Sequence, residues 1–89
     1  MSGEAGLRVN TRFFAIYRER AGLKEEELHL DEGATSAGLV SRLSELHPGL
    51  FEGGGRLVVA VNGEYVPMDH LLADGDEVAL IPPVSGGRS

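Results

Sequence analysis

Hydrophobic and polar residues alternate along several short segments of the chain, and this alternation predicts β-strands. In residues 7–14 one side of the strand carries Leu7, Val9, Thr11 and Phe13, and the other carries Arg8, Asn10, Arg12 and Phe14. Residues 27–30 alternate again with both leucines inward, so these two strands are expected to form a hairpin. Residues 57–61 are apolar throughout, which is typical of a strand in the interior of a sheet.

Turn-forming residues separate the later strands. Asn62-Gly63 predicts a tight turn. It leads into a short strand at Tyr65 that Pro67 confines to the edge of the sheet. Asp74-Gly75-Asp76 predicts a second turn before the last strand, at residues 77–81.

One segment has the spacing of an amphipathic helix. Thr35 or Ser36 can cap its start, and Pro48-Gly49 ends it. Its apolar stripe consists of Leu39, Val40, Leu43 and Leu46. A shorter helical turn is expected at residues 17–21, and residues 50–56, with their three consecutive glycines, predict a mobile loop.

This order of elements predicts an α+β fold, because a single helix must bury its stripe against one face of a sheet. With the first and last strands side by side in the middle, the arrangement is the ubiquitin-like β-grasp. It has a mixed sheet of four to five strands packed on one main helix. We expect residues 1–6 to be a disordered lead, residues 7–81 one domain and residues 82–89 an extended tail.

Composition narrows the possible functions. The 89 residues include no cysteine, which excludes disulfides, thiolate metal sites and cysteine nucleophiles. The formal net charge of −6 argues against nucleic acid and agrees with a protein partner that has a basic surface. No apolar run is long enough to span a membrane and no secretory pattern is visible, so we expect a cytoplasmic protein.

The side chains form no recognisable enzyme site. The three histidines lack metal-ligand spacing, and no serine lies in a nucleophile turn. We therefore expect no metal and no bound cofactor. The remaining candidate for chemistry is the tail, where Pro82-Pro83-Val84 makes a stiff stem and Gly86-Gly87 a slim end without side chains.

Several segments together resemble the small subunit of molybdopterin synthase. They are Phe13-Phe14-Ala15 with Arg18-Glu19, Val61-Asn62, Asp69-His70 with Leu72, residues 74–79 (Asp-Gly-Asp-Glu-Val-Ala) and residues 82–87 (Pro-Pro-Val-Ser-Gly-Gly). The resemblance covers residues 7–87, and its tail half is the specific part. The first half fits several ubiquitin-like sulfur carriers.

The resemblance implies a carrier whose partners perform the catalysis. In this family an activating enzyme uses ATP to adenylate the C-terminal glycine carboxylate, and sulfur then replaces the adenylate to give a thiocarboxylate. The tail enters the large subunit of the synthase, which transfers the sulfur to a pterin precursor of the molybdenum cofactor. Gly87 would carry the sulfur, and Gly86 would give it a slim approach.

The chain departs from the family pattern by continuing to Arg88-Ser89. A peptide bond cannot be adenylated as a free carboxylate can, so the resemblance requires that Gly87 be exposed first. There are three explanations. A protease removes the dipeptide, the dipeptide is an artificial addition, or the protein has lost carrier activity. The intact stem before the glycines favours the first two.

Strand parity predicts a docking surface beside the tail. Phe14 has the opposite parity to the inward Phe13, and Ile81 has the opposite parity to Leu80. With Tyr65 and the stem residues Pro82, Pro83 and Val84, they are expected to form a docking surface. The resemblance implies that the large subunit of the synthase binds there. Scattered surface hydrophobes or a second small core are the alternatives.

Three other functions remain open. A carrier of the same build could supply sulfur for thiamine, cysteine or tRNA thiolation. A ubiquitin-like modifier would be joined through Gly87 to lysines of target proteins, and the residues after Gly87 slightly favour it. The third is a binding module with an inert tail.

Overall fold

The computed structural model describes residues 6–52 and 57–82. In chain order the elements are β1 (Gly6–Phe13), α1 (Ile16–Ala21), β2 (Glu25–Asp31), α2 (Ser36–Leu46), β3 (Val58–Val61), β4 (Glu64–Val66) and β5 (Glu77–Ile81). This succession agrees with the predicted one, and β5 has the predicted bounds. Gly6 belongs to β1 and not to the lead, while residues 1–5 and the tail from residue 83 lie outside the described residues.

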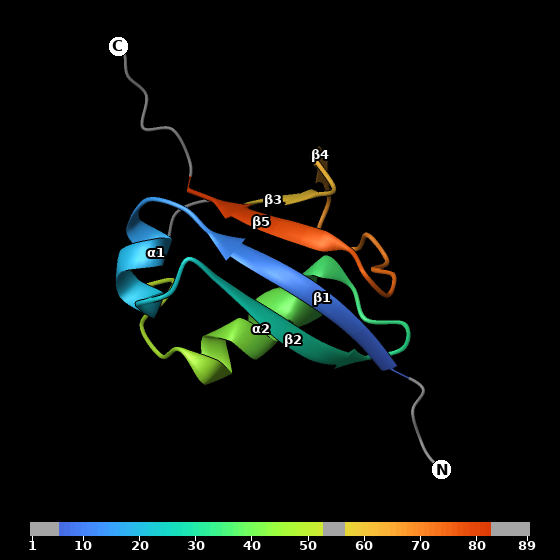
Figure 1. Cartoon of the computed structure of the whole chain (residues 1–89). Coiled ribbons are helices and arrows are strands. Elements are labelled where there is room, and N and C mark those ends of the chain that lie inside the picture. The colour runs from blue at the N-terminus through green and yellow to red at the C-terminus, as the bar shows by residue number, and fades with distance from the viewer. Residues whose placement is uncertain (1–5, 53–56, 83–89) are drawn as a thin grey trace.

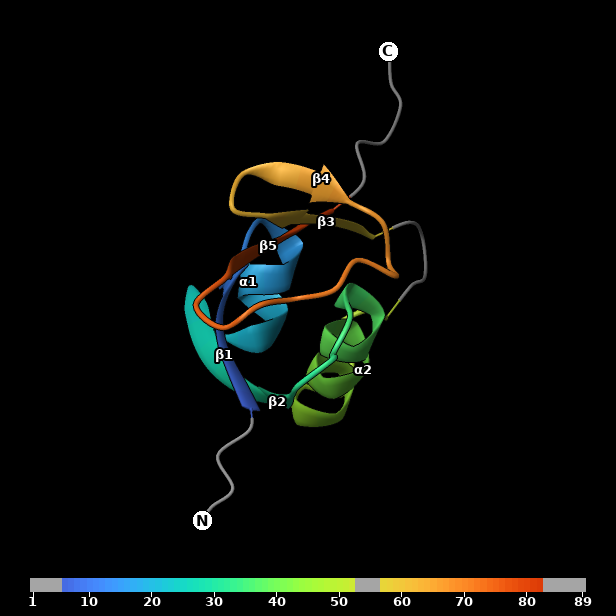
Figure 2. The same cartoon turned by 90° about the vertical axis from the view of Figure 1, so that its right-hand side faces the viewer.

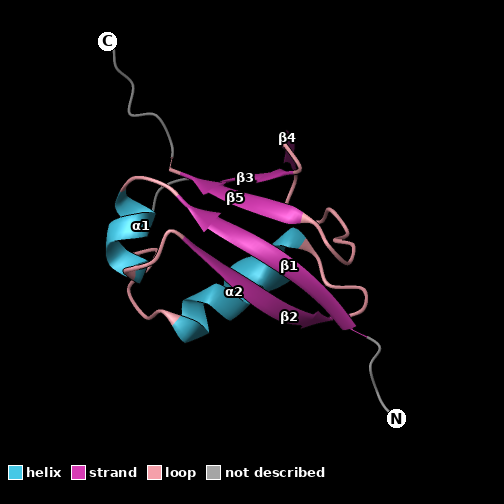
Figure 3. Cartoon of the chain, in the orientation of Figure 1, coloured by secondary structure: helices cyan, strands magenta, loops and turns pink. Residues whose placement is uncertain are grey.

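The five strands form one mixed sheet in the order β2-β1-β5-β3-β4 (Figure 1). β1 and β5 pair in parallel at its centre, and the other neighbours pair antiparallel. α2 covers one face of the sheet (Figure 2), and α1 lies at the end where β1 and β5 finish (Figure 3). The predicted β-grasp arrangement is confirmed.

The core lies between the sheet and α2. The inward residues of β1 are all buried, as the alternation predicts, and Leu39 and Leu43 of α2 have no exposed surface. Thr35 caps the helix by accepting a hydrogen bond from the Gly38 N–H at 3.2 Å.

Leu46 does not belong to the buried stripe, so that part of the prediction is wrong. This residue is 40% exposed. The place against the sheet at this end of α2 is taken by His47, whose ring packs edge-on against Phe13 at 5.9 Å. His47 Nε2 also lies 2.7 Å from Glu26 Oε1 on β2.

The loop predicted from residue 50 begins with a core residue. Leu50 is only 1% exposed, and the Phe51 ring packs edge-on against Tyr17 at 5.5 Å. Arg20 Nη1 donates to the Leu50 carbonyl at 3.1 Å and to the Glu52 carbonyl at 2.7 Å. Residues 50–52 are therefore fastened to α1, and residues 53–56 lie outside the described residues.

Candidate functional site

The face of the sheet opposite α2 is open, and the cross-strand register shows which residues share it. Ala60 pairs with Tyr65 on β4 and with Ala79 on β5, and Ala79 pairs with Arg12 on β1. Directly opposed residues in neighbouring strands point to the same face. These residues therefore lie in one row across the open face.

The two halves of the open face differ in chemistry. The half over β3, β4 and the end of β5 is apolar. It consists of Val58, Tyr65, Ala79 and Ile81, together with Phe14, which directly follows β1. We refer to it as the apolar half. The half over β1, β2 and the start of β5 is polar, and its side chains bind one another. Arg12 Nη1 lies 3.2 Å from Glu77 Oε2, and Asn10 Nδ2 donates to Glu25 Oε1 at 2.8 Å.

Phe14 and Ile81 lie at the same end of the sheet. Phe13 pairs with Leu80 in the parallel ladder between β1 and β5, so Phe14 and Ile81 are the next residues of two neighbouring segments. Phe14 is 43% exposed and Phe13 is 2% exposed, which confirms the opposite parity of the two phenylalanines. Tyr65 is 76% exposed and Ile81 is half-buried. That these residues bind a partner stays a prediction.

A tight turn holds Phe14 at the surface. The Phe14 carbonyl accepts a hydrogen bond from the Tyr17 N–H at 3.0 Å, and Ala15 has a φ of 52°. A positive φ is strained for alanine, at a cost of about 1–3 kcal/mol.

Burial raises the pKa of the Tyr17 hydroxyl above its ordinary value, and the nearby Arg20 cation offsets part of that effect.

The predicted tail residues are only partly described. Pro82 follows β5 directly and is half-buried. Pro83, Val84, Gly86 and Gly87 lie outside the described residues. The apolar half therefore reaches the point at which the chain leaves the sheet towards the predicted reactive end.

Two of the recognised motifs meet at the other end of β5. Asp76 accepts hydrogen bonds on both carboxylate oxygens, from Asn62 Nδ2 at 2.9 Å and from the Ala73 N–H at 2.8 Å. Asn62 Oδ1 in turn accepts from the Glu77 N–H at 3.0 Å. Asn62 and Gly63 both have positive φ, which confirms the predicted tight turn. The hydrogen bonds between Asn62 and Asp76 and between Asn62 and Glu77 join the β3–β4 turn to the start of β5, so the role of these two motifs in this chain is structural.

Asp76→Ala should lower the free energy of unfolding by about 1–2 kcal/mol, because two donors lose a charged acceptor at a partly exposed site. Urea unfolding of the purified chain measures this change. Glu32→Ala, at an exposed turn position, is the matched control and should change stability by less than about 0.5 kcal/mol. Equal effects of the two substitutions would show that the Asp76 hydrogen bonds contribute nothing.

The sequence prediction missed Val58, Ala60 and Ala79 on the open face. A strand that is apolar throughout gives no parity, so the residues of β3 could not be assigned to a face. The small alanines at positions 60 and 79 were the available signal. In the structure Ala60 pairs with Ala79 on one side and with Tyr65 on the other.

Among residues 6–52 and 57–82, no group of three or more histidine and acidic side chains is placed to hold a metal. Within the same ranges, none of the helices is long and apolar enough to cross a membrane.

The fold and the open face define a ubiquitin-like β-grasp protein with an apolar surface beside its C-terminal strand. The model of the ThiS family matches residues 11–87. The chain therefore belongs to the ThiS family, which confirms the resemblance that the motifs indicated.

Related proteins match over almost the whole chain. The molybdopterin synthase sulfur carrier subunit of Chlamydomonas reinhardtii is 42% identical over 83 residues, covering 91% of this chain and 100% of that protein. The subunit of the same name from Mycobacterium tuberculosis is 37% identical over 82 residues, covering 91% and 99%. Small archaeal modifier protein 3 of Haloferax volcanii is 35% identical over 95 residues, covering 91% and 100%.

Solved structures show the same architecture. Small archaeal modifier protein 1 of Haloferax volcanii has a TM-score of 0.80 at 30% identity and covers 89% of this chain and 100% of that one. A chain in the complex of subunits 1 and 2 of the molybdopterin-converting factor from Helicobacter pylori has a TM-score of 0.59. It is 32% identical, and the match covers 91% of this chain and 100% of that chain.

Proposed function

We propose that this chain is the sulfur-carrying small subunit of a molybdopterin synthase and acts in molybdenum cofactor biosynthesis. The observation that carries the proposal is the match of the Chlamydomonas carrier subunit, at 42% identity, over the full length of that protein. The tail sequence Pro-Pro-Val-Ser-Gly-Gly at residues 82–87 supports it, because a chain ending at Gly87 would present a slim carboxylate on a stiff extension.

The chemistry of the carrier would take place at Gly87. Once Arg88 and Ser89 have been removed, the free carboxylate of Gly87 would attack the α-phosphate of ATP on an activating enzyme, which gives an acyl adenylate and releases pyrophosphate. A persulfide sulfur then attacks the acyl carbon and displaces AMP, and reductive cleavage of the S–S bond by a thiol leaves a thiocarboxylate. ATP is bound by the activating enzyme, and this chain holds no cofactor of its own.

The partner that receives the sulfur would be the large subunit of the synthase. The apolar half supports this part of the proposal, since exposed apolar surface commonly marks a protein interface. The likeness to a chain of the Helicobacter two-subunit complex supports it further. The large subunit would supply the catalytic residues, and Phe14, Tyr65 and Ile81 with the stem residues Pro82, Pro83 and Val84 would bind it.

A reconstitution tests the proposed function. The chain ending at Gly87 is incubated with ATP, a persulfide donor, and the activating enzyme and large subunit of its source organism. We expect a mass increase equal to the exchange of one oxygen for sulfur, a stable complex on size-exclusion chromatography, and conversion of the pterin precursor to its dithiolene. A sulfurated chain that neither binds the large subunit nor yields dithiolene would overturn the assignment to this pathway.

A protein modifier is the second candidate, favoured by the identity to small archaeal modifier protein 3. In that case the activated Gly87 carboxyl would form an isopeptide bond with a lysine amine of a target and release AMP. Mass spectrometry of tryptic digests separates the two functions, because only the modifier leaves a remnant of the tail on lysines. The same reconstitution mixture can be used for this measurement.

A further inference from the structure

The outer edge of β2 is free among the described strands. β2 stands at the end of the sheet order and pairs with β1 alone. The Phe13 N–H donates to the Lys24 carbonyl at 2.8 Å, which fixes the alternation of this antiparallel ladder. The backbone N–H and C=O groups of Glu25, Glu27 and His29 therefore point away from β1. Such an unpaired row of donors and acceptors is a template for a further strand.

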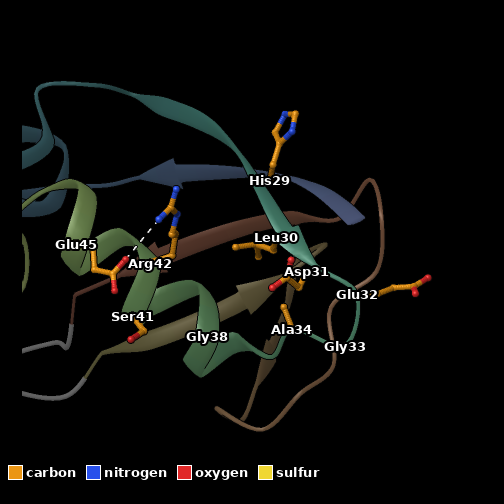
Figure 4. A pocket seen from close by; sticks show the side chains of 10 residues that line it. All are labelled: His29, Leu30, Asp31, Glu32, Gly33, Ala34, Gly38, Ser41, Arg42 and Glu45. Atoms are coloured by element: carbon orange, nitrogen blue, oxygen red, sulfur yellow. Dashed lines mark hydrogen bonds and ion pairs between the residues drawn. The ribbon is translucent and has the colours of Figure 1, made fainter. Parts of the chain in front are cut away.

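A hollow of about 560 Å³ lies along this edge, between β2 and α2 (Figure 4). Leu30 lines it from β2 and points towards α2, while His29 points to the other side of the strand. Gly38 lines it from α2, and a Cβ at this position would meet nothing nearer than Thr35 Oγ1 at 3.8 Å. The hollow therefore has room for side chains of an added strand.

The side chains along the edge indicate what can pair with it. β2 carries Glu25, Glu27 and Asp31 at alternating positions, with Glu32 directly after the strand. A second copy of the chain pairing through this edge would set carboxylates against carboxylates, and like charges across a strand pair are unfavourable. A segment with lysine or arginine at alternating positions would meet opposite charges instead.

We propose that the β2 edge binds an extended, basic peptide segment of a partner protein as a sixth strand. Its aliphatic side chains enter the hollow beside Leu30, and its basic side chains lie beside Glu25 and Glu27. This edge is separated from the apolar half by β1, so both surfaces can be occupied at once. The proposal does not rest on the sulfur-carrier function.

The test uses the full chain labelled with ¹⁵N and an acetylated, amidated heptapeptide of alternating lysine and valine. Amide shifts should change along Glu25–Asp31 and along α2 near Gly38, and binding should weaken at high ionic strength. A heptapeptide of alternating glutamate and valine should bind about tenfold more weakly or not at all. Equal binding of the two peptides, or shifts centred on Tyr65 and Ile81, would overturn the proposal.

Two substitutions on α2 localise the site. Gly38→Phe fills the hollow and should weaken binding of the lysine–valine peptide about tenfold. Ser44→Phe adds the same ring at an exposed position of α2 that does not line the hollow, and it should leave binding unchanged. Thermal unfolding of both variants shows that they are folded. The proposal would be contradicted if folded Gly38→Phe bound the peptide as well as the unsubstituted chain. Amide shifts at β2 that depend on protein concentration without peptide would also contradict it, because they would show that a second copy occupies the edge.

Discussion

A chain that ends at Gly87 should be adenylated by the activating enzyme, whereas the chain that continues through Arg88 and Ser89 should not react until the dipeptide is removed. The reason is chemical. A free carboxylate is the nucleophile that attacks the α-phosphate of ATP, and a peptide carbonyl is a far weaker one. We therefore expect an all-or-none difference between the two forms, which is the largest effect predicted for this protein.

ATP–pyrophosphate exchange with each form measures this difference, and intact mass before and after the reaction shows whether the longer chain was cleaved. Equal exchange by an uncleaved longer chain would refute the prediction. Gly86→Ala and Gly87→Ala in the shorter chain serve as controls for the tail. Both should leave the free energy of unfolding within about 0.5 kcal/mol, since substitutions near a chain terminus usually change stability little. Sulfur transfer should fall, because the added methyl group would obstruct a narrow active site.

Phe14→Ala should weaken binding to the large subunit about thirtyfold, which corresponds to about 2 kcal/mol. Phe14 lies at the end of the apolar half from which the chain leaves β5, and aromatic residues at interface centres commonly dominate the binding energy. The stability of the isolated chain should change much less, since Phe14 is 43% exposed before any partner binds. Isothermal titration gives the affinity, and urea unfolding gives the stability.

Leu46→Ala is the matched control for Phe14→Ala. Leu46 has a similar exposure of 40%, but it lies on α2, on the other side of the sheet. This substitution should leave the affinity for the large subunit unchanged. A Phe14→Ala variant that loses stability and keeps its affinity would mean that Phe14 belongs to the core and that the open face is used differently.

The local features of the fold were determined by the sequence itself. The alternation in residues 7–14 predicted the buried and exposed sides of β1, because successive side chains of a strand point to opposite faces. Asn62-Gly63 and the Thr35 cap were predictable for a similar reason, since the backbone conformation at each depends on the residue itself and its immediate neighbours. The motifs of the C-terminal half, at residues 74–79 and 82–87, could also be recognised from the sequence and indicated the family.

Contacts between distant residues were decided only by the tertiary structure. The pairing of Val58 with Ile81 and of Ala60 with Ala79 placed Val58 and Ala60 on the open face, which the uniformly apolar sequence of β3 could not do. Leu50 packs in the core, and its carbonyl accepts a hydrogen bond from Arg20, 30 residues earlier in the chain. The packing of α2 on the sheet also left Leu46 exposed at one end of the helix and formed the hollow beside Leu30. In each case the outcome depends on which segments become neighbours. The packing of the whole sheet on α2 determines these neighbours, and the residues adjacent in sequence do not.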